Sequence, residues 1–324
     1  MLALLALLWM SNQAATIENG SNWSDGFVIL HVTEVHEGCA TLMGGTLHEG
    51  GYQVCLVPTG VESEYRLAPV PGDDGQYCYF GGTASNGDRV TMETVDGIQL
   101  LVSRNHEGTV THVFQELQGS LRDLMLRDLH MAYAGEYLDN HGKQWTFTLD
   151  GRLQRPGTSS PEPYTILDIF EMPSEVMQTA QGDYLMIKLS TTGLNVYSCT
   201  WDEENEHYGD QEPELVAKLR RTGSPWNSSG VCPYTQNVLI TGTMASRFDT
   251  AMLRKIRNEV WARHGYAFSS ADLRDYFSQQ PWYTPNPNGN QSIKLSPIEQ
   301  MNVDILRSVE IEPQRDWLVT EEGF

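Results

Sequence analysis

The sequence has no closely spaced cysteine pair and few basic side chains. Its five cysteines in 324 residues lie far apart, which excludes zinc ribbons and Cys-x-x-Cys redox motifs. Lys and Arg total 21 against 42 Asp and Glu, a net charge of −21. Such a field repels phosphates, so neither nucleic acid nor an anionic membrane surface is expected as a general partner.

Signatures of catalysis are also missing. The chain contains no His-Glu-x-x-His, no Gly-x-Ser-x-Gly, no phosphate-binding glycine loop and no dinucleotide fingerprint. The tripeptide His-Glu-Gly at 36, 48 and 106 is typical of turns and lacks metal-ligand spacing. The acidic run 202–214 does not match a calcium loop and indicates a solvated surface. We therefore predict no catalytic residue, no metal and no cofactor.

The first residues resemble an export signal. Leu2 to Trp9 is an apolar run, and Ala14 and Ala15 offer a cleavage point. We expect a signal peptide over residues 1–15 and an exported protein, periplasmic or extracellular. No later segment is long and apolar enough to span a membrane.

Export makes disulfides plausible. Two disulfides and one free thiol would fit, with one pair among residues 39–78 and another between Cys199 and Cys232. Buried, reduced cysteines are the alternative.

The sequence pattern of residues 16–224 predicts an antiparallel β-rich body. Short alternating runs, such as Trp145, Phe147 and Leu149, are separated by turns such as Asp150-Gly151. We divide the body into a β-rich region at 16–118 and a meander at 119–224. Sandwich, meander and small barrel remain open; the second part is weakly similar to lipocalin-like barrels, although a generic antiparallel sheet is favoured.

The C-terminal part predicts a small three-helix module at 246–312, after a linker at 225–245 and before a tail at 313–324. Leu253, Ile256 and Val260 follow helical spacing, and Gly265 suits a left-handed cap. Ser269 with Asp272 suggests a second helix start. The segment Ser296-Pro297-x-Glu299 predicts a third, from about 297 to 310. The whole is therefore an α+β multidomain protein.

The run Trp261-Ala-Arg-His-Gly265 resembles the signature of the YARHG domain, with Trp261 where that family usually has tyrosine. The resemblance covers about residues 246–312. Further matching positions include Tyr266, Phe268, Leu273, Tyr276, Phe277, Trp282, Tyr283, Pro285, Glu299 and Asn302. It implies a secreted bacterial protein and a role at the cell envelope.

The motif residues allow two interpretations. The candidate binding residues are Arg257, Asn258, Glu259, Trp261, Arg263, His264, Trp282 and Tyr283. They would either face a ligand, with Arg263 on a carboxylate and the aromatics stacked on sugar rings, or hold the helices together. The structural interpretation is favoured.

Three functions stay open. The first is a non-catalytic exported protein that docks on a cell-envelope component or a protein partner. The second is a carrier of a small ligand inside a lipocalin-like β region. The third is an envelope hydrolase of unrecognised type. We favour the first.

Overall fold

The computed structural model describes residues 17, 21–26, 29–36, 39–45, 52–68, 89–117, 119–167, 175–202, 207–208, 212–226 and 230–311. The predicted signal peptide, the predicted tail and most of the acidic run 202–214 lie outside these residues. The chain divides into two compact units. The first contains residues 1–121, 241–245 and 304–324, and the second contains residues 122–240 and 246–303.

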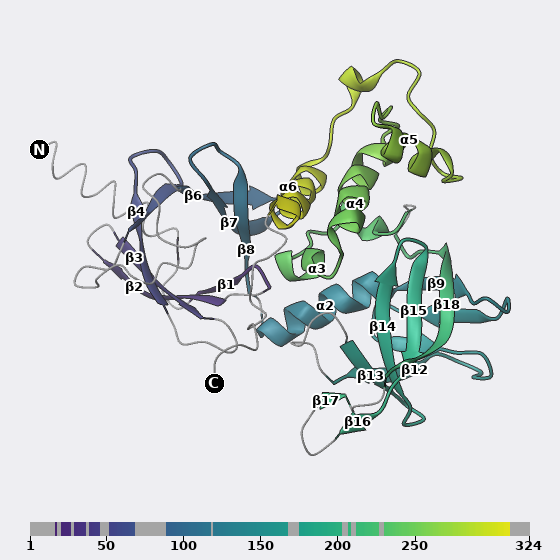
Figure 1. Ribbon diagram of the computed structural model, residues 1–324. Coiled ribbons are helices and arrows are strands. Elements are labelled where there is room, and N and C mark those ends of the chain that lie inside the picture. Colours follow the sequence, from purple (N-terminus) through teal and green to yellow (C-terminus); the bar gives the residue numbers. More distant parts are fainter. Residues whose placement is uncertain are drawn as a thin grey trace, which may run out of the picture. The chain divides into compact units, whose positions relative to one another are not determined.

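The first unit contains an antiparallel barrel in which each strand pairs with the next along the chain (Figure 1). Its strands are β1 (Asn22–Ser24), β2 (Ile29–His36), β3 (Cys39–Gly45), β4 (Tyr52–Pro58), β5 (Glu64–Ala68), β6 (Arg89–Val95), β7 (Ile98–Arg104) and β8 (Val110–Glu116). Two residue pairs, Trp23 with Glu116 and Ser24 with Gln115, close it between β1 and β8.

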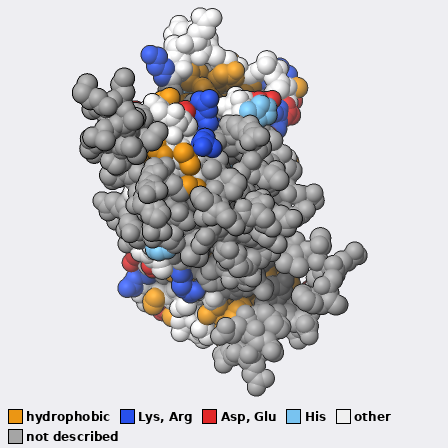
Figure 2. Space-filling view, turned by 90° about the vertical axis from the view of Figure 1, so that its left-hand side faces the viewer, with side chains coloured by type: hydrophobic (Ala, Val, Ile, Leu, Met, Phe, Trp, Pro, Cys, Tyr) orange, Lys and Arg blue, Asp and Glu red, His pale blue; other side chains and the backbone are white. Residues whose placement is uncertain are grey.

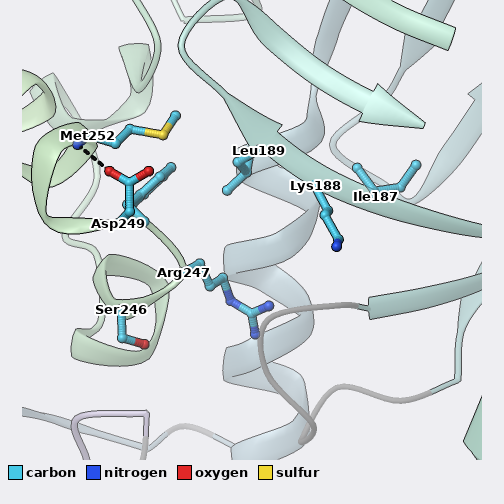
Figure 3. Close-up of a pocket in the computed structure, with 8 residues that line it drawn as sticks. Ile187, Lys188, Leu189, Ser246, Arg247, Asp249 and Met252 are labelled. Carbon is cyan, nitrogen blue, oxygen red and sulfur yellow. Dashed lines mark hydrogen bonds between the residues drawn. The ribbon is translucent and has the colours of Figure 1, made fainter. Parts of the chain in front are cut away.

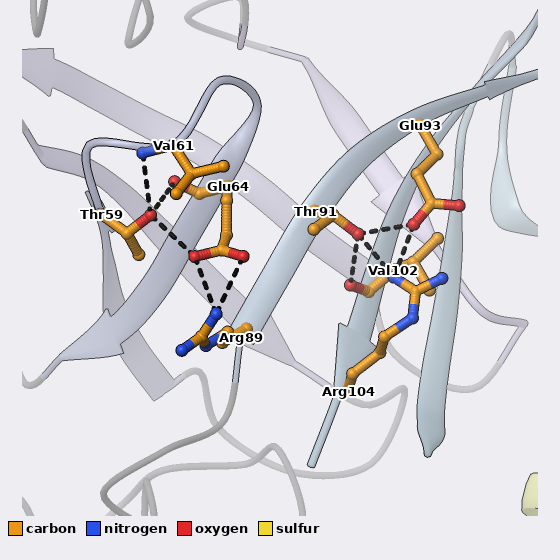
Figure 4. A network of polar contacts seen from close by, with 8 residues as sticks. All are labelled: Thr59, Val61, Glu64, Arg89, Thr91, Glu93, Val102 and Arg104. Atoms are coloured by element: carbon orange, nitrogen blue, oxygen red, sulfur yellow. Dashed lines mark hydrogen bonds and ion pairs between the residues drawn. The ribbon is translucent and has the colours of Figure 1, made fainter. Parts of the chain in front are cut away.

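The β6–β7 hairpin shows why its turn has this sequence. Asp96 and Gly97 have φ angles of 49° and 83°, and a two-residue turn that matches strand twist needs positive φ at both positions. Ion pairs then link β5, β6 and β7 on the surface (Figure 4). Arg89 contacts Glu64 at 3.2 Å, and Arg104 contacts Glu93 at 2.5 Å.

The second unit contains another closed antiparallel barrel. Of the two alternatives for this region, a barrel and a generic antiparallel sheet, the structure has the barrel. Its strands are β9 (Gly135–Leu138), β10 (Gln144–Phe147), β11 (Arg152–Gln154), β12 (Glu162–Ile166), β13 (Glu175–Thr179), β14 (Tyr184–Ser190), β15 (Gly193–Ser198) and β18 (Glu214–Gly223). Strand β18 returns to pair with β9. A small hairpin, β16 (Trp201–Asp202) and β17 (His207–Tyr208), lies between β15 and β18 in sequence.

Two details differ from the sequence prediction. A helix, α2 (Leu121–Tyr133), begins the region that was predicted as a pure meander. It buries Leu124, Met125 and Leu129 at helical spacing. Leu149 is 44% exposed, because β10 ends at Phe147 and the Asp150-Gly151 turn follows at once.

Aromatic side chains fill the interior next to α2. Tyr137, Phe147 and Tyr164 are buried, and their rings contact one another edge-on at centroid distances of 5.8 Å and 6.2 Å. The Tyr137 hydroxyl donates to the Tyr133 carbonyl at 2.6 Å. This packing gives the barrel a solid aromatic core at the described residues and does not favour a ligand chamber there.

The C-terminal segment is helical. It consists of η1 (Pro233–Gln236), α3 (Gly242–Ser246), α4 (Thr250–Arg263), α5 (Ala271–Ser278), η2 (Asn290–Ser292) and α6 (Pro297–Ile311). The three predicted helices are confirmed as α4, α5 and α6. The start of α5 was misplaced: its N-cap is Ser270, without a side-chain cap hydrogen bond, and not Ser269.

Part of this segment belongs to the first unit. The amides of Gly242 and Thr243 donate to the Asp25 carbonyl at 2.9 Å and 3.4 Å. A Cβ on Gly26 would lie 2.3 Å from the Thr243 hydroxyl oxygen, and Gly26 has a φ of 96°. Only glycine therefore fits this contact. Among the described residues, no helix has both the length and the apolar character needed to cross a bilayer.

Candidate functional site

Helix α4 carries most of the signature residues and is fixed at both ends. The Asp249 side chain accepts a hydrogen bond from the Met252 amide at 2.7 Å, as an N-cap does. Gly265, just past the helix, has the predicted left-handed φ of 78°. Leu253, Ile256 and Val260 are buried on one face. The cap, the terminator and the apolar stripe thus agree on where α4 begins and ends.

Glu259 and Arg263 form a buried ion pair one helical turn apart. Their side chains are 1% and 5% exposed. The carboxylate of Glu259 also accepts from the amides of Val231 and Cys232 at 2.7 Å and 3.0 Å. The Arg263 guanidinium donates to the Thr235 hydroxyl at 2.9 Å and to the Cys232 carbonyl at 2.8 Å. Both charged side chains therefore hold segment 230–235 against α4 through hydrogen bonds within the domain.

Gly230 shows how close this contact is. It has a φ of 114°, and a Cβ at this position would lie 2.2 Å from the Glu259 carboxyl group. A side chain here would displace the carboxylate from its two backbone partners. The segment before α4 is therefore shaped to receive Glu259.

His264 joins α4 to α6. Its Nε2 lies 2.7 Å from the Glu299 carboxylate, which is itself buried. The other oxygen of Glu299 accepts from the Ser296 amide at 2.8 Å, and the Ser296 hydroxyl accepts from the Glu299 amide at 3.2 Å. The predicted capping box at the start of α6 is thus present, and the same glutamate also binds the signature histidine.

Asn302 fixes α6 to the segment that precedes α3. It is fully buried, and its side-chain oxygen accepts from the Ile240 amide at 3.0 Å. Its side-chain nitrogen donates to the carbonyls of Thr235 and Val238 at 2.7 Å and 2.8 Å. Asn302 thus provides hydrogen-bond partners for one backbone amide and two backbone carbonyls, as buried polar groups require.

The aromatic signature residues surround a small core. Phe268 and Phe277 stack at 4.8 Å between centroids. Around them, packed on the core and half-buried, lie Trp261, Tyr266, Tyr276, Trp282 and Tyr283. The Tyr283 hydroxyl donates to the Tyr266 carbonyl at 2.7 Å. These five side chains therefore pack on the core and remain partly accessible to solvent.

The other two candidates are held within the protein. Asn258 donates from its side chain to the Arg254 carbonyl at 2.7 Å, one turn back along α4. Arg257 is half-buried and also makes contacts within the chain. The candidates therefore separate into an internal polar set (Glu259, Arg263, His264), locally bound residues (Arg257, Asn258) and half-exposed aromatics (Trp261, Trp282, Tyr283).

The predicted disulfide between Cys199 and Cys232 is wrong, because both are free thiols. Cys232 is buried where its carbonyl, amide and sulfur each serve the network around Glu259, and the Tyr234 hydroxyl donates to its sulfur at 3.3 Å. Burial and the Glu259 carboxylate raise the pKa of Cys232 to about 12, and burial raises that of Cys199 to about 11. Both are protonated at neutral pH. Cys55 is disulfide-bonded.

Sequence reasoning missed the partners of the signature. Residues 231–245 were predicted as linker, yet Cys232, Tyr234, Leu239 and Ile240 are each 1% exposed. Glu299 and Asn302 matched the family pattern but were not chosen as site residues. The apolar run from Val238 to Ile240 was the available signal, because an exposed linker rarely carries one. Within the described parts of the chain, no group of His, Cys, Asp and Glu converges as a metal site.

Comparison with known proteins agrees with this arrangement. Residues 231–311 match the YARHG domain family. Neither the curated proteins nor the solved structures contain a significant match to the chain. The match begins at residue 231, so it includes the segment that Glu259 and Arg263 hold. The C-terminal module of this chain, from residue 231 to residue 311, is a YARHG domain.

Proposed function

We propose that this chain is a non-catalytic exported protein whose YARHG domain docks on a component of the bacterial cell envelope. The observation that carries the proposal is the set of half-exposed aromatic rings, Trp261, Tyr266, Trp282 and Tyr283, packed on a rigid helical frame. Partly exposed aromatic rings are effective contact groups because their ordering costs little conformational entropy.

The buried polar network supports this division of roles. Glu259, Arg263 and Asn302 form hydrogen bonds to backbone groups of the same domain, so these three side chains stabilise the helical frame. A frame held in this way keeps the neighbouring rings in one geometry, and pre-organised groups lose less entropy on binding.

Charge also favours the helical end as the docking surface. Residues 243–324 hold 9 Lys and Arg against 11 Asp and Glu, which leaves 12 against 31 for residues 1–242. In Figure 2, hydrophobic side chains lie beside Lys and Arg side chains at the upper end of the face shown. Anionic envelope polymers are repelled less by this nearly neutral part than by the rest of the chain.

Support for a non-catalytic role comes from the two free thiols. Both are held protonated, as their raised pKa values show, so neither is an activated nucleophile at neutral pH. The signature histidine contacts a carboxylate that the capping box already holds.

The test is co-sedimentation of the purified full chain with insoluble bacterial cell wall. Trp282→Ala should weaken binding about tenfold, equivalent to roughly 1.4 kcal/mol, which is typical of a lost aromatic anchor. Tyr197→Ala removes a half-buried aromatic of β15, outside the domain, and serves as the matched control. Circular dichroism of each variant checks that it is folded.

Two outcomes would overturn the proposal. One is that the wild-type chain stays in the supernatant with the cell wall present. The other is that folded Trp282→Ala and Tyr197→Ala bind equally well.

A further inference from the structure

Strand β18 carries two adjacent apolar side chains at the surface of the second barrel, where it lies between β15 and β9 (Figure 1). Leu215 is 43% exposed and Val216 is 47% exposed. The other large hydrophobic side chains exposed in the described part of the chain, Val61 and Leu149, are single residues in connections between strands. Single exposed apolar residues are normal on a protein surface, so the adjacent pair on β18 is the feature that requires an explanation.

A register shift in β18 accounts for two consecutive exposed side chains. In a regular strand, neighbouring side chains point to opposite faces of the sheet. Ala217 of β18 pairs with Val196 of β15. The next residue of β15, Tyr197, pairs with Leu215, so Val216 is an extra residue in β18, as in a β-bulge. The break in alternation leaves both apolar side chains accessible at the surface.

Charged side chains flank this apolar pair, with one sign on each side. Glu212 and Glu214 precede the pair, and Lys218 and Arg220 follow it. All four are exposed. Within the described part of the chain, no ion pair involves any of these four side chains. The surface of β18 thus has an acidic end, an apolar centre and a basic end.

These charges are too far apart to pair within one chain. A strand rises about 3.3 Å per residue, so Glu214 and Lys218 lie about 13 Å apart along β18. In a second copy packed antiparallel about Val216, residue 214 of one copy lies opposite residue 218 of the other, and residue 212 lies opposite residue 220. A parallel arrangement would instead place each charge against its own kind. The charge pattern is therefore self-complementary about a twofold axis, as the interface of a symmetric dimer must be.

The cavity of the second unit has no such pattern. It has a volume of about 330 Å³ and lies between β14 and the segment that leads into α4 (Figure 3). Asp249, which lines it, accepts a hydrogen bond from the Met252 amide. Arg247, which also lines it, interacts with the carboxylate of Asp128 and makes further contacts within the chain. These two charged groups of the cavity are therefore engaged inside the chain, in contrast to the charged side chains of β18.

We propose that the exposed surface of β18 joins two copies of this chain in an antiparallel dimer with twofold symmetry. Leu215 and Val216 of the two copies meet at the centre, and the two glutamates of each copy pair with Lys218 and Arg220 of the other. The apolar area is small for a permanent interface, so the expected dissociation constant is on the order of 10–100 µM.

The dimer does not depend on the docking function proposed above, so either proposal can fail alone. If both hold, a dimer brings two YARHG domains to one envelope polymer, and its apparent affinity for that polymer rises without any new contact.

Sedimentation velocity of the full chain from about 5 to 500 µM, in about 0.15 M salt, tests the proposal. The wild-type chain should pass from monomer to dimer as its concentration rises. Lys218→Glu places a carboxylate opposite Glu214 of the second copy and should weaken the dimer about tenfold or more. Lys294→Glu makes the same change in net charge at an exposed position outside β18 and is the matched control.

An exchange of charges tests the antiparallel register itself. Glu214→Lys alone should weaken the dimer as Lys218→Glu does. The chain that carries both substitutions again has opposite charges across the axis, so its dissociation constant should return to within about threefold of the wild-type value. Circular dichroism checks that each variant is folded, which is expected because both positions are exposed.

Three results would each overturn the proposal. The first is a wild-type chain that remains monomeric at about 500 µM, which would point to a partner other than a second copy. The second is a folded Lys218→Glu variant that dimerises as well as Lys294→Glu does. The third is a chain with both substitutions that dimerises no better than either single variant.

Discussion

Glutamate and arginine pair in two very different environments in this molecule. In the YARHG domain, Glu259 and Arg263 are 1% and 5% exposed and bind backbone groups as well as each other. On the first barrel, Glu64 and Arg89 are 15% and 63% exposed. Water and salt screen the barrel pair, whereas the pair in the domain is desolvated and each charge depends on its partners.

The difference in burial between the two ion pairs indicates how much each one contributes to the stability of the fold. A surface pair contributes little to folding, and its loss is tolerated. A buried pair is not necessarily better than an apolar one of equal size, but the removal of one member leaves an uncompensated charge. The charged pair of the signature, Glu259 and Arg263, therefore acts as a structural link between α4 and residues 230–235.

The largest effect is expected for Glu259→Gln. It would leave the Arg263 guanidinium buried without its counter-charge, at a cost of about 3–5 kcal/mol in the free energy of unfolding. Urea unfolding followed by tryptophan fluorescence measures the loss. Glu93→Gln on the first barrel is the matched control and should cost less than about 1 kcal/mol. A loss below about 1 kcal/mol for Glu259→Gln would break the comparison.

A neutral member of the same network should show an intermediate effect. Asn302→Ala removes three hydrogen bonds to buried backbone groups, and we expect a loss of about 2–4 kcal/mol. Asn288→Ala, at an exposed loop position, is the control. Equal urea midpoints for the two variants would show that the network around Asn302 is not stabilising.

The smallest effect is expected for the barrel pair. A double-mutant cycle on Glu64 and Arg89, with glutamine at each position, should give a coupling energy of about 0.2–1 kcal/mol. This coupling should disappear near 1 M salt, where the screening length is about 3 Å. The same cycle on Glu259 and Arg263 should keep its coupling in salt. If both couplings respond alike, burial does not distinguish the two pairs.

Local patterns in the sequence predicted the helices of the domain well. Leu253, Ile256 and Val260 gave the buried face of α4, Gly265 gave its end, and Ser296 with Glu299 gave the start of α6. These features depend on residues within a few positions of each other, so a local pattern contains the information. The same holds for the Asp96-Gly97 and Asp150-Gly151 turns, whose glycines have positive φ.

Contacts between distant residues were not predictable in this way. The helix α2 was missed in a region that otherwise alternates like strands. Cys199 and Cys232 were predicted as a disulfide pair, but both are free thiols, and Cys232 lies within the Glu259 network instead. The segment 231–245 was interpreted as linker because its burial depends on Glu259, Arg263 and Asn302, which lie 27 to 67 positions away along the chain.

The sequence by itself determined the family of the C-terminal module, the end of α4 and the start of α6, the acidic character of the β-rich part and the lack of known catalytic motifs. Only the tertiary structure decided that the β-rich part closes into two barrels and that the signature charges face inward. The physical reason is that strand closure, desolvation of a charge and convergence of side chains depend on which distant segments meet, and no local pattern records those meetings.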